Sequence, residues 1–145
     1  MRLRLLRLFL AVSGFVWAVS IVGVFVPWSS AENMLLGMGA QPIAYDPMLD
    51  YWLRMASGAF FLVGIVFLLL AAFPRRYVSM IPVFGWLMLA EGAILAFHGF
   101  RLGLRPFPFY GDISSCFVLG AGILVLRNAP SETKANVEVS EGSSE

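Results

Sequence analysis

Residues 82–100 read PVFGWLMLAEGAILAFHGF, an almost wholly apolar run that decides the fold of this chain. About 20 apolar residues, each rising 1.5 Å, cross the ~30 Å hydrocarbon layer of a membrane as one helix. Such a helix places Glu91 near the middle of the bilayer, where an isolated charge is most costly. The run therefore predicts a transmembrane helix with one acidic side chain at membrane depth.

One face of this predicted helix is polar and lined by small residues. Glu91 and His98 are seven residues apart, which leaves them within ~20° of each other around the helix axis. Gly85, Gly92 and Gly99 repeat with the same step beside them. Because small residues let a neighbouring backbone come close, we expect this face to point into a helix bundle and Glu91 to contact protein.

The composition assigns the whole chain to the membrane class. Of its 145 residues, 59% are hydrophobic and 13% are charged, and the mean hydropathy is +0.82. A soluble domain is closer to half apolar and a quarter charged. The net charge of +1 gives no reason to expect a nucleic-acid partner. The single cysteine, Cys116, excludes an internal disulfide and a cysteine-rich metal site, and we interpret it as an apolar filler of a helix interface.

The chain contains three further apolar segments. Together with residues 82–100 they predict an all-α fold, in which residues 1–127 form a bundle of four transmembrane helices joined by short loops. The four spans cover about residues 5–26, 51–73, 82–100 and 109–126. The first span also resembles a signal peptide cleaved after Ala31, but its apolar part exceeds the ~7–15 residues of a usual signal core, which favours a retained helix. A turn of only a few residues around Arg75 predicts that the second and third spans pack as an antiparallel hairpin.

Two segments lie outside these spans. Ser29 and Glu32 have the spacing of a capping box, which predicts a short interfacial helix that ends at Gly37 or Gly39. Residues 128–145 are polar and acidic, and they cannot bury enough apolar surface to become ordered. We therefore expect them to form a disordered cytoplasmic tail.

The basic residues predict the orientation of the chain, because lysine and arginine next to transmembrane spans mark the cytoplasmic side. Seven of them fall on one side of the membrane: Arg2, Arg4, Arg7, Arg75, Arg76, Arg127 and Lys134. Three fall on the other side: Arg54, Arg101 and Arg105. The sequence thus predicts a multi-pass protein of the cell (cytoplasmic) membrane with both termini in the cytoplasm.

Four polar side chains are the candidate ligand-binding residues: Glu91, His98, Arg54 and Asp112. Glu91 has two interpretations, a protonatable group in a pocket or proton path and a structural hydrogen bond to Ser20 or a backbone carbonyl. His98 lies about 10 Å from Glu91 along the helix, so a proton relay between them needs a bridging water. The alternative for His98 is a hydrogen bond to a loop or a lipid headgroup.

Arg54 and Asp112 are expected at the outer ends of their helices, where they could pair across the rim. Alternatively, Arg54 reaches lipid headgroups and Asp112 caps the fourth helix at Ser114 and Ser115. No metal site is expected, because His98 is the only histidine and lacks a partner four residues away on its helix. No cofactor is expected either, since the chain has no phosphate loop, haem motif or nucleophile with a base.

Four stretches follow one another in a recognisable order: DPMLDYWLRMASGAFFLVG at 46–64, a short PRRY turn at 74–77, IPVFGWLMLAEGAILAFHG at 81–99 and FYGD at 109–112. With the glycine-rich last helix that follows, this pattern resembles small uncharacterised bacterial four-helix membrane proteins of the DoxX-like kind. The resemblance covers most of the chain from the second span to the end of the fourth. It implies the four-helix fold only, and no activity or functional residue comes with it.

These features favour binding over catalysis. We expect a non-enzymatic small membrane protein that binds a lipid-like ligand or a partner membrane protein, with Glu91 as the buried polar anchor. One alternative is a membrane-embedded enzyme that acts on a lipophilic substrate, with Glu91 as acid or base and with His98 and Asp112 as further catalytic candidates. Another is a proton-coupled carrier that works as an oligomer. Membrane lipids and a homo-oligomer or partner membrane protein are the expected partners.

Overall fold

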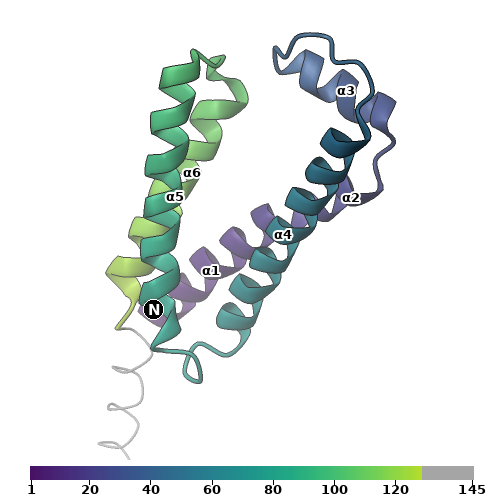
Figure 1. Cartoon of the computed structure of the whole chain (residues 1–145). Coiled ribbons are helices and arrows are strands. Elements are labelled where there is room, and N and C mark those ends of the chain that lie inside the picture. The colour runs from purple at the N-terminus through teal and green to yellow at the C-terminus, as the bar shows by residue number, and fades with distance from the viewer. Residues whose placement is uncertain (129–145) are drawn as a thin grey trace, which may run out of the picture.

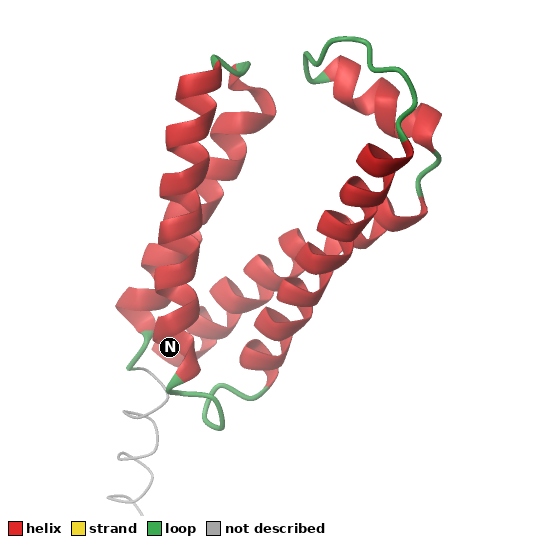
Figure 2. Ribbon diagram, viewed as in Figure 1, coloured by secondary structure: helices red, strands yellow, loops and turns green. Residues whose placement is uncertain are grey.

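The computed structural model describes residues 1–128, in which helices are joined by short connections and no strand occurs (Figures 1 and 2). The first long segment consists of α1 (Arg2–Ala18), a 3-10 turn η1 (Val19–Ile21) and α2 (Val22–Phe25). The other helices are the short α3 (Trp28–Gly37) and the long α4 (Pro47–Ala72), α5 (Met80–Leu102) and α6 (Pro106–Leu126). Four segments are long and apolar enough to cross a membrane, so the predicted all-α, four-span fold class is confirmed. The predicted tail lies, from residue 129 onward, outside the described residues.

The long helices pack as two pairs. α1 packs along α4 and α5 packs along α6, while α1 also contacts α6. The pairs meet at the end of the molecule that carries the N-terminus, here named the closed end, and they diverge toward the opposite, open end (Figure 1). The expected hairpin packing of α4 against α5 is wrong. The two helices are antiparallel, but each makes its extensive contacts with a different partner.

A close backbone crossing explains why α4 pairs with α1. A Cβ atom added at Gly64 of α4 would lie 2.8 Å from both the Ala18 Cα and the Gly14 carbonyl oxygen of α1, and closer still to the Ala18 amide nitrogen. These neighbours are main-chain atoms, so the two helices touch where neither has a side chain. Only small residues permit such an approach.

The glycine stripe on α5 explains its pairing with α6. Gly85, Gly92 and Gly99 are all buried. A Cβ atom at Gly92 would lie 3.1 Å from the Cys116 Cβ, and one at Gly99 would overlap the ring of Phe109. The prediction that this stripe faces a neighbouring helix is confirmed, and the neighbour is α6.

The shared hydrophobic core is confined to the closed end. Its buried members come from α1, α4, α5 and α6, and they are Leu6, Leu10, Phe67, Leu70, Ile81, Met88, Leu119 and Ile123. Within this core, Phe67 of α4 meets Phe84 of α5 with ring centroids 5.2 Å apart. Toward the open end the two helix pairs no longer share a core, which leaves space between them.

Helix ends follow local sequence signals, with one correction. The Asp46 side chain accepts a hydrogen bond of 2.8 Å from the Met48 amide, so α4 begins a turn earlier than predicted. Gly103, with a φ of 62°, ends α5 in the left-handed conformation that glycine favours. The predicted capping box of α3 is wrong, because the helix already begins at Trp28 and places Ser29 inside its first turn. The helix ends at Gly37, as predicted.

Candidate functional site

Three cavities follow one another along α5 between the helix pairs, and together they are named the groove. The open-end cavity has a volume of about 690 Å³ and is lined by His98 and Asp112 among others. It shares Leu95 and Asp112 with a middle cavity of about 240 Å³. The middle cavity in turn shares Trp17, Phe60 and Glu91 with a third cavity of about 240 Å³ nearer the closed end. Because neighbouring cavities share walls, the groove runs along more than half of α5.

The middle cavity brings together two of the four candidate residues. Glu91 reaches it from α5 and Asp112 from α6, and neither is fully buried. Its remaining wall includes Trp17 of α1 and Phe60 of α4. All four long segments therefore contribute to this cavity, and it exists only when both helix pairs are in place.

The hydroxyl groups of the middle cavity bond to the backbone. The Ser20 Oγ lies 2.6 Å from the Trp17 carbonyl oxygen and 3.0 Å from the Ser57 carbonyl oxygen, so its single hydrogen is directed at main-chain acceptors. The Ser115 Oγ donates to the Asp112 carbonyl at 2.8 Å. Over residues 1–128 no side chain donates a hydrogen bond to Glu91. The structural bond between Ser20 and Glu91, one of the two interpretations of this carboxyl, is not formed.

Asp112 lies inside α6 and does not cap it. α6 begins at Pro106, with Arg105 as the residue before it, and its backbone is non-helical at Phe107 (φ −102°, ψ 134°). The predicted capping by Asp112 is therefore wrong, because the helix starts at Pro106, about one turn before the predicted start near residue 109. Asp112 lies within the helix and lines both the open-end and the middle cavities.

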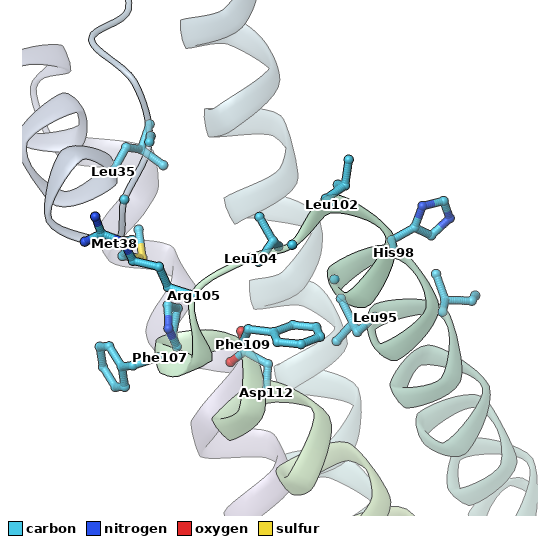
Figure 3. A pocket seen from close by; sticks show the side chains of 16 residues that line it. Leu35, Met38, Leu95, His98, Leu102, Leu104, Arg105, Phe107, Phe109 and Asp112 are labelled. Carbon is cyan, nitrogen blue, oxygen red and sulfur yellow. The ribbon is translucent and has the colours of Figure 1, made fainter.

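His98 lines the open-end cavity at its edge. Its side chain is exposed, and its ring packs edge-on against Phe97 at a centroid distance of 5.2 Å. Figure 3 shows the imidazole pointing away from Asp112 and Arg105. His98 does not line the middle cavity with Glu91. Among the described residues, no group of three or more histidine, cysteine, aspartate or glutamate side chains could hold a metal ion.

Arg105 spans the open end. Its side chain lies over Gly39, where an added Cβ atom would be 2.7 Å from the Arg105 Nε. Gly39 follows α3, whereas Arg105 precedes α6, so this contact joins the connection between α3 and α4 to the start of α6 at the open end. The open-end cavity lies beside it, with Met38 and Phe107 in its wall.

Arg54 does not take part in the groove. Its Nη1 donates to the Val24 carbonyl oxygen at 2.6 Å, and its Nη2 pairs with Asp50 at 3.0 Å, one turn earlier on α4. The pair between Arg54 and Asp112 is therefore not formed. The guanidinium instead ties α4 to the last turn of α2, next to the point where that span ends.

We expect Arg54→Met to lower the free energy of unfolding by about 1–3 kcal/mol, because the Val24 carbonyl loses a donor that carries a charge. Thermal unfolding in detergent, followed by circular dichroism, measures the change. Arg101→Met is the matched control, since Arg101 is an exposed arginine with no hydrogen bond or ion pair to another described residue. Equal unfolding temperatures for the two variants would show that the Val24 contact does not stabilise the α2–α4 junction.

Several lining residues of the groove were not among the sequence candidates. Trp17 and Phe60 pack against each other with ring centroids 5.0 Å apart and form one wall. In a membrane span an aromatic side chain gives the same sequence signal whether it faces lipid or a cavity. Cys116 is buried against Gly92, as expected of a helix-interface residue, and it also borders the middle cavity.

Comparison with known proteins assigns no family to the chain: no family model, curated protein or solved structure matches it. The DoxX-like resemblance therefore stays a prediction. The chemistry of the groove is the remaining guide to function.

Proposed function

We propose that this protein binds a lipid-like molecule with a single hydrocarbon chain in the groove between its two helix pairs. The observation that carries the proposal is the position of Glu91. Its carboxyl group lies in a helix apolar enough to span a membrane, has no hydrogen-bond or ion-pair partner among the described residues, and faces a cavity. A carboxyl group at such a depth is costly unless it serves a site, so it is the polar anchor for a ligand.

The walls of the groove support a ligand with two unlike ends. The cavity nearest the closed end is lined by Trp17, Phe60, Phe67 and Phe84 together with aliphatic side chains and Met88. Among the described residues, Glu91 is the only charged one that borders it. The open-end cavity carries Arg105, His98 and Asp112. A chain in the aromatic part and a polar group at the middle cavity match this division. Pockets for small molecules are commonly apolar with a few polar groups that fix orientation.

The proposal includes a location. We propose a bacterial cytoplasmic membrane, with the closed end of the molecule on the cytoplasmic side. Arg2, Arg4 and Arg7 begin the chain at that end, and Arg75 and Arg76 lie in the connection between α4 and α5 (Figure 1). Basic residues next to spans favour the cytoplasmic side. In this orientation the open-end cavity is accessible from the outer leaflet.

A photoreactive single-chain alcohol tests the proposal on the full chain in lipid nanodiscs. We expect labelling that saturates, is displaced by unlabelled decanol, and maps to residues of the groove such as Trp17 and Leu95. Labelling confined to Trp86 and Val118, which are exposed on the outside of α5 and α6, would contradict the proposal. That pattern is the one expected of annular lipid alone.

Leu95→Trp should reduce saturable labelling by at least about tenfold, because Leu95 borders both the open-end and middle cavities and a larger side chain fills their junction. Val83→Trp is the matched control, since Val83 lies on the same helix but is exposed and borders none of the three cavities. The measurement is the labelled fraction by mass spectrometry at equal probe concentration. Equal labelling of the two variants would place the ligand outside the groove.

A further inference from the structure

The hydrogen-bonding groups of the middle cavity are mostly acceptors. The carboxylates of Glu91 and Asp112 have only acceptor atoms when ionised. The hydroxyl hydrogens of Ser20 and Ser115 are directed at backbone carbonyls, which leaves only their lone pairs for a ligand. The remaining donors are the thiol of Cys116, which is weak, and the indole N–H of Trp17. A ligand that fits this cavity is therefore one that donates or carries positive charge.

The two carboxylates also lack a basic partner. Over residues 1–128, no lysine or arginine borders the middle cavity. Arg54 is held by Asp50 and the Val24 carbonyl, and Arg105 lies over Gly39 at the open end. A cation in this cavity would therefore meet two acidic side chains without a competing basic group, and charge attraction favours such a ligand.

The other walls of the cavity suit an organic cation better than a metal ion. Trp17 and Phe60 form an edge-to-face pair at the level of Glu91 and border both the middle cavity and the cavity nearer the closed end. Aromatic faces attract ammonium groups, and tryptophan does so most strongly. An ammonium group with an attached chain could contact the carboxylates and the aromatic wall together.

We propose that the ligand is a lipophilic amine or quaternary ammonium, with its cationic head between Glu91 and Asp112 and its chain along Trp17 and Phe60 toward the closed end. This inference rests on the proposed function and names the chemical class of its ligand. It also gives Asp112 a role, because Asp112 lies between the middle cavity and the mouth through which a charged head enters.

Competition between matched amphiphiles tests the charge of the ligand. The full chain is placed in nanodiscs of phosphatidylcholine, whose headgroup carries no net charge, and is labelled with the photoreactive alcohol. Decyltrimethylammonium, decyl sulfate and decanol then compete at equal bilayer concentration, which is measured with empty nanodiscs. Tetramethylammonium, which has the same head and no chain, is the fourth competitor. We expect decyltrimethylammonium to displace the probe at a concentration at least about tenfold below that of decyl sulfate. Tetramethylammonium should not displace it.

Two variants and one control test whether Glu91 and Asp112 cause the preference for the cationic amphiphile. Glu91→Gln should abolish the advantage of decyltrimethylammonium over decyl sulfate while decanol competes as before, and Asp112→Asn should reduce that advantage. Glu32→Gln is the control, because Glu32 is an acidic residue of α3 that borders none of the cavities. Unfolding temperatures equal to that of the parent protein establish that the variants remain folded.

The outcomes separate this inference from the proposed function. If decanol competes but the two charged amphiphiles do so equally, or if decyl sulfate is the stronger, the groove binds a ligand and the cationic class is wrong. A preference that survives both Glu91→Gln and Asp112→Asn overturns the assignment in the same way. If none of the three chain-bearing competitors displaces the probe, the proposed function fails and this inference fails with it.

Discussion

Gly64→Ala is expected to destabilise the protein by about 3 kcal/mol, although it adds a single methyl group. The new Cβ atom would overlap the Ala18 amide nitrogen and lie 2.8 Å from the Gly14 carbonyl oxygen. Main-chain atoms cannot rotate away as the end of a side chain can. The α1–α4 crossing must therefore widen along its whole length, and the contacts on either side of it are weakened.

Gly58→Ala is the matched control for this prediction. It lies on the same helix, and its added Cβ atom would meet only the Val24 Cγ2, at 4.0 Å. Because alanine is the better helix former, we expect its stability to stay within about 1 kcal/mol of the parent protein. Thermal unfolding of both variants in the same detergent makes the comparison. If Gly64→Ala unfolds at the temperature of Gly58→Ala, the close crossing of α1 and α4 is not present.

Gly99→Ala is expected to cost about 2–3 kcal/mol by a different route. Here the added Cβ atom would overlap the ring of Phe109, which is only 7% exposed. That ring already packs against Phe100 and Tyr110, each with a centroid distance of 5.4 Å, so it has no free space to enter. It must leave its site, and α5 and α6 separate at the open end.

Two measurements check the effect at Gly99. Unfolding temperature reports the loss of stability, and Gly111→Ala is the control, because an added Cβ atom at Gly111 has no neighbour within 4 Å. Phe109 also borders the open-end cavity, so labelling by the photoreactive alcohol should change in Gly99→Ala and not in Gly111→Ala. Unchanged stability and labelling would show that Phe109 is not packed on Gly99.

The spans were predictable because apolar run length directly determines whether a helix can cross a membrane. The face of α5 that packs was also predictable, since Gly85, Gly92 and Gly99 lie on one side. Its partner was not, because periodicity identifies a buried face without naming the helix that covers it. The short connection after Phe73 favours α4 as the neighbour, whereas the close glycine contacts join α5 to α6.

The candidate site, too, could be predicted from the sequence only in part. Glu91 and Asp112 stand out in the sequence because acidic residues are rare in apolar segments, but only the packing of α5 on α6 brings them to one cavity. Arg54 and Asp50 are four residues apart on one helix, a spacing at which opposite charges attract. That local signal was present in the sequence and would have identified the partner of Arg54. The aromatic wall gave no such signal.

The pairing of neighbouring spans bears on how the chain is made. α1 and α4 are consecutive transmembrane segments, and both have been synthesised before the ribosome reaches α5. Their glycine crossing and the bond from Arg54 to Val24 lie wholly within residues 1–72, so the first pair can assemble in the membrane while the second is still being translated. In this order α5 and α6 would dock on a finished half, and the groove would be the last part of the protein to form.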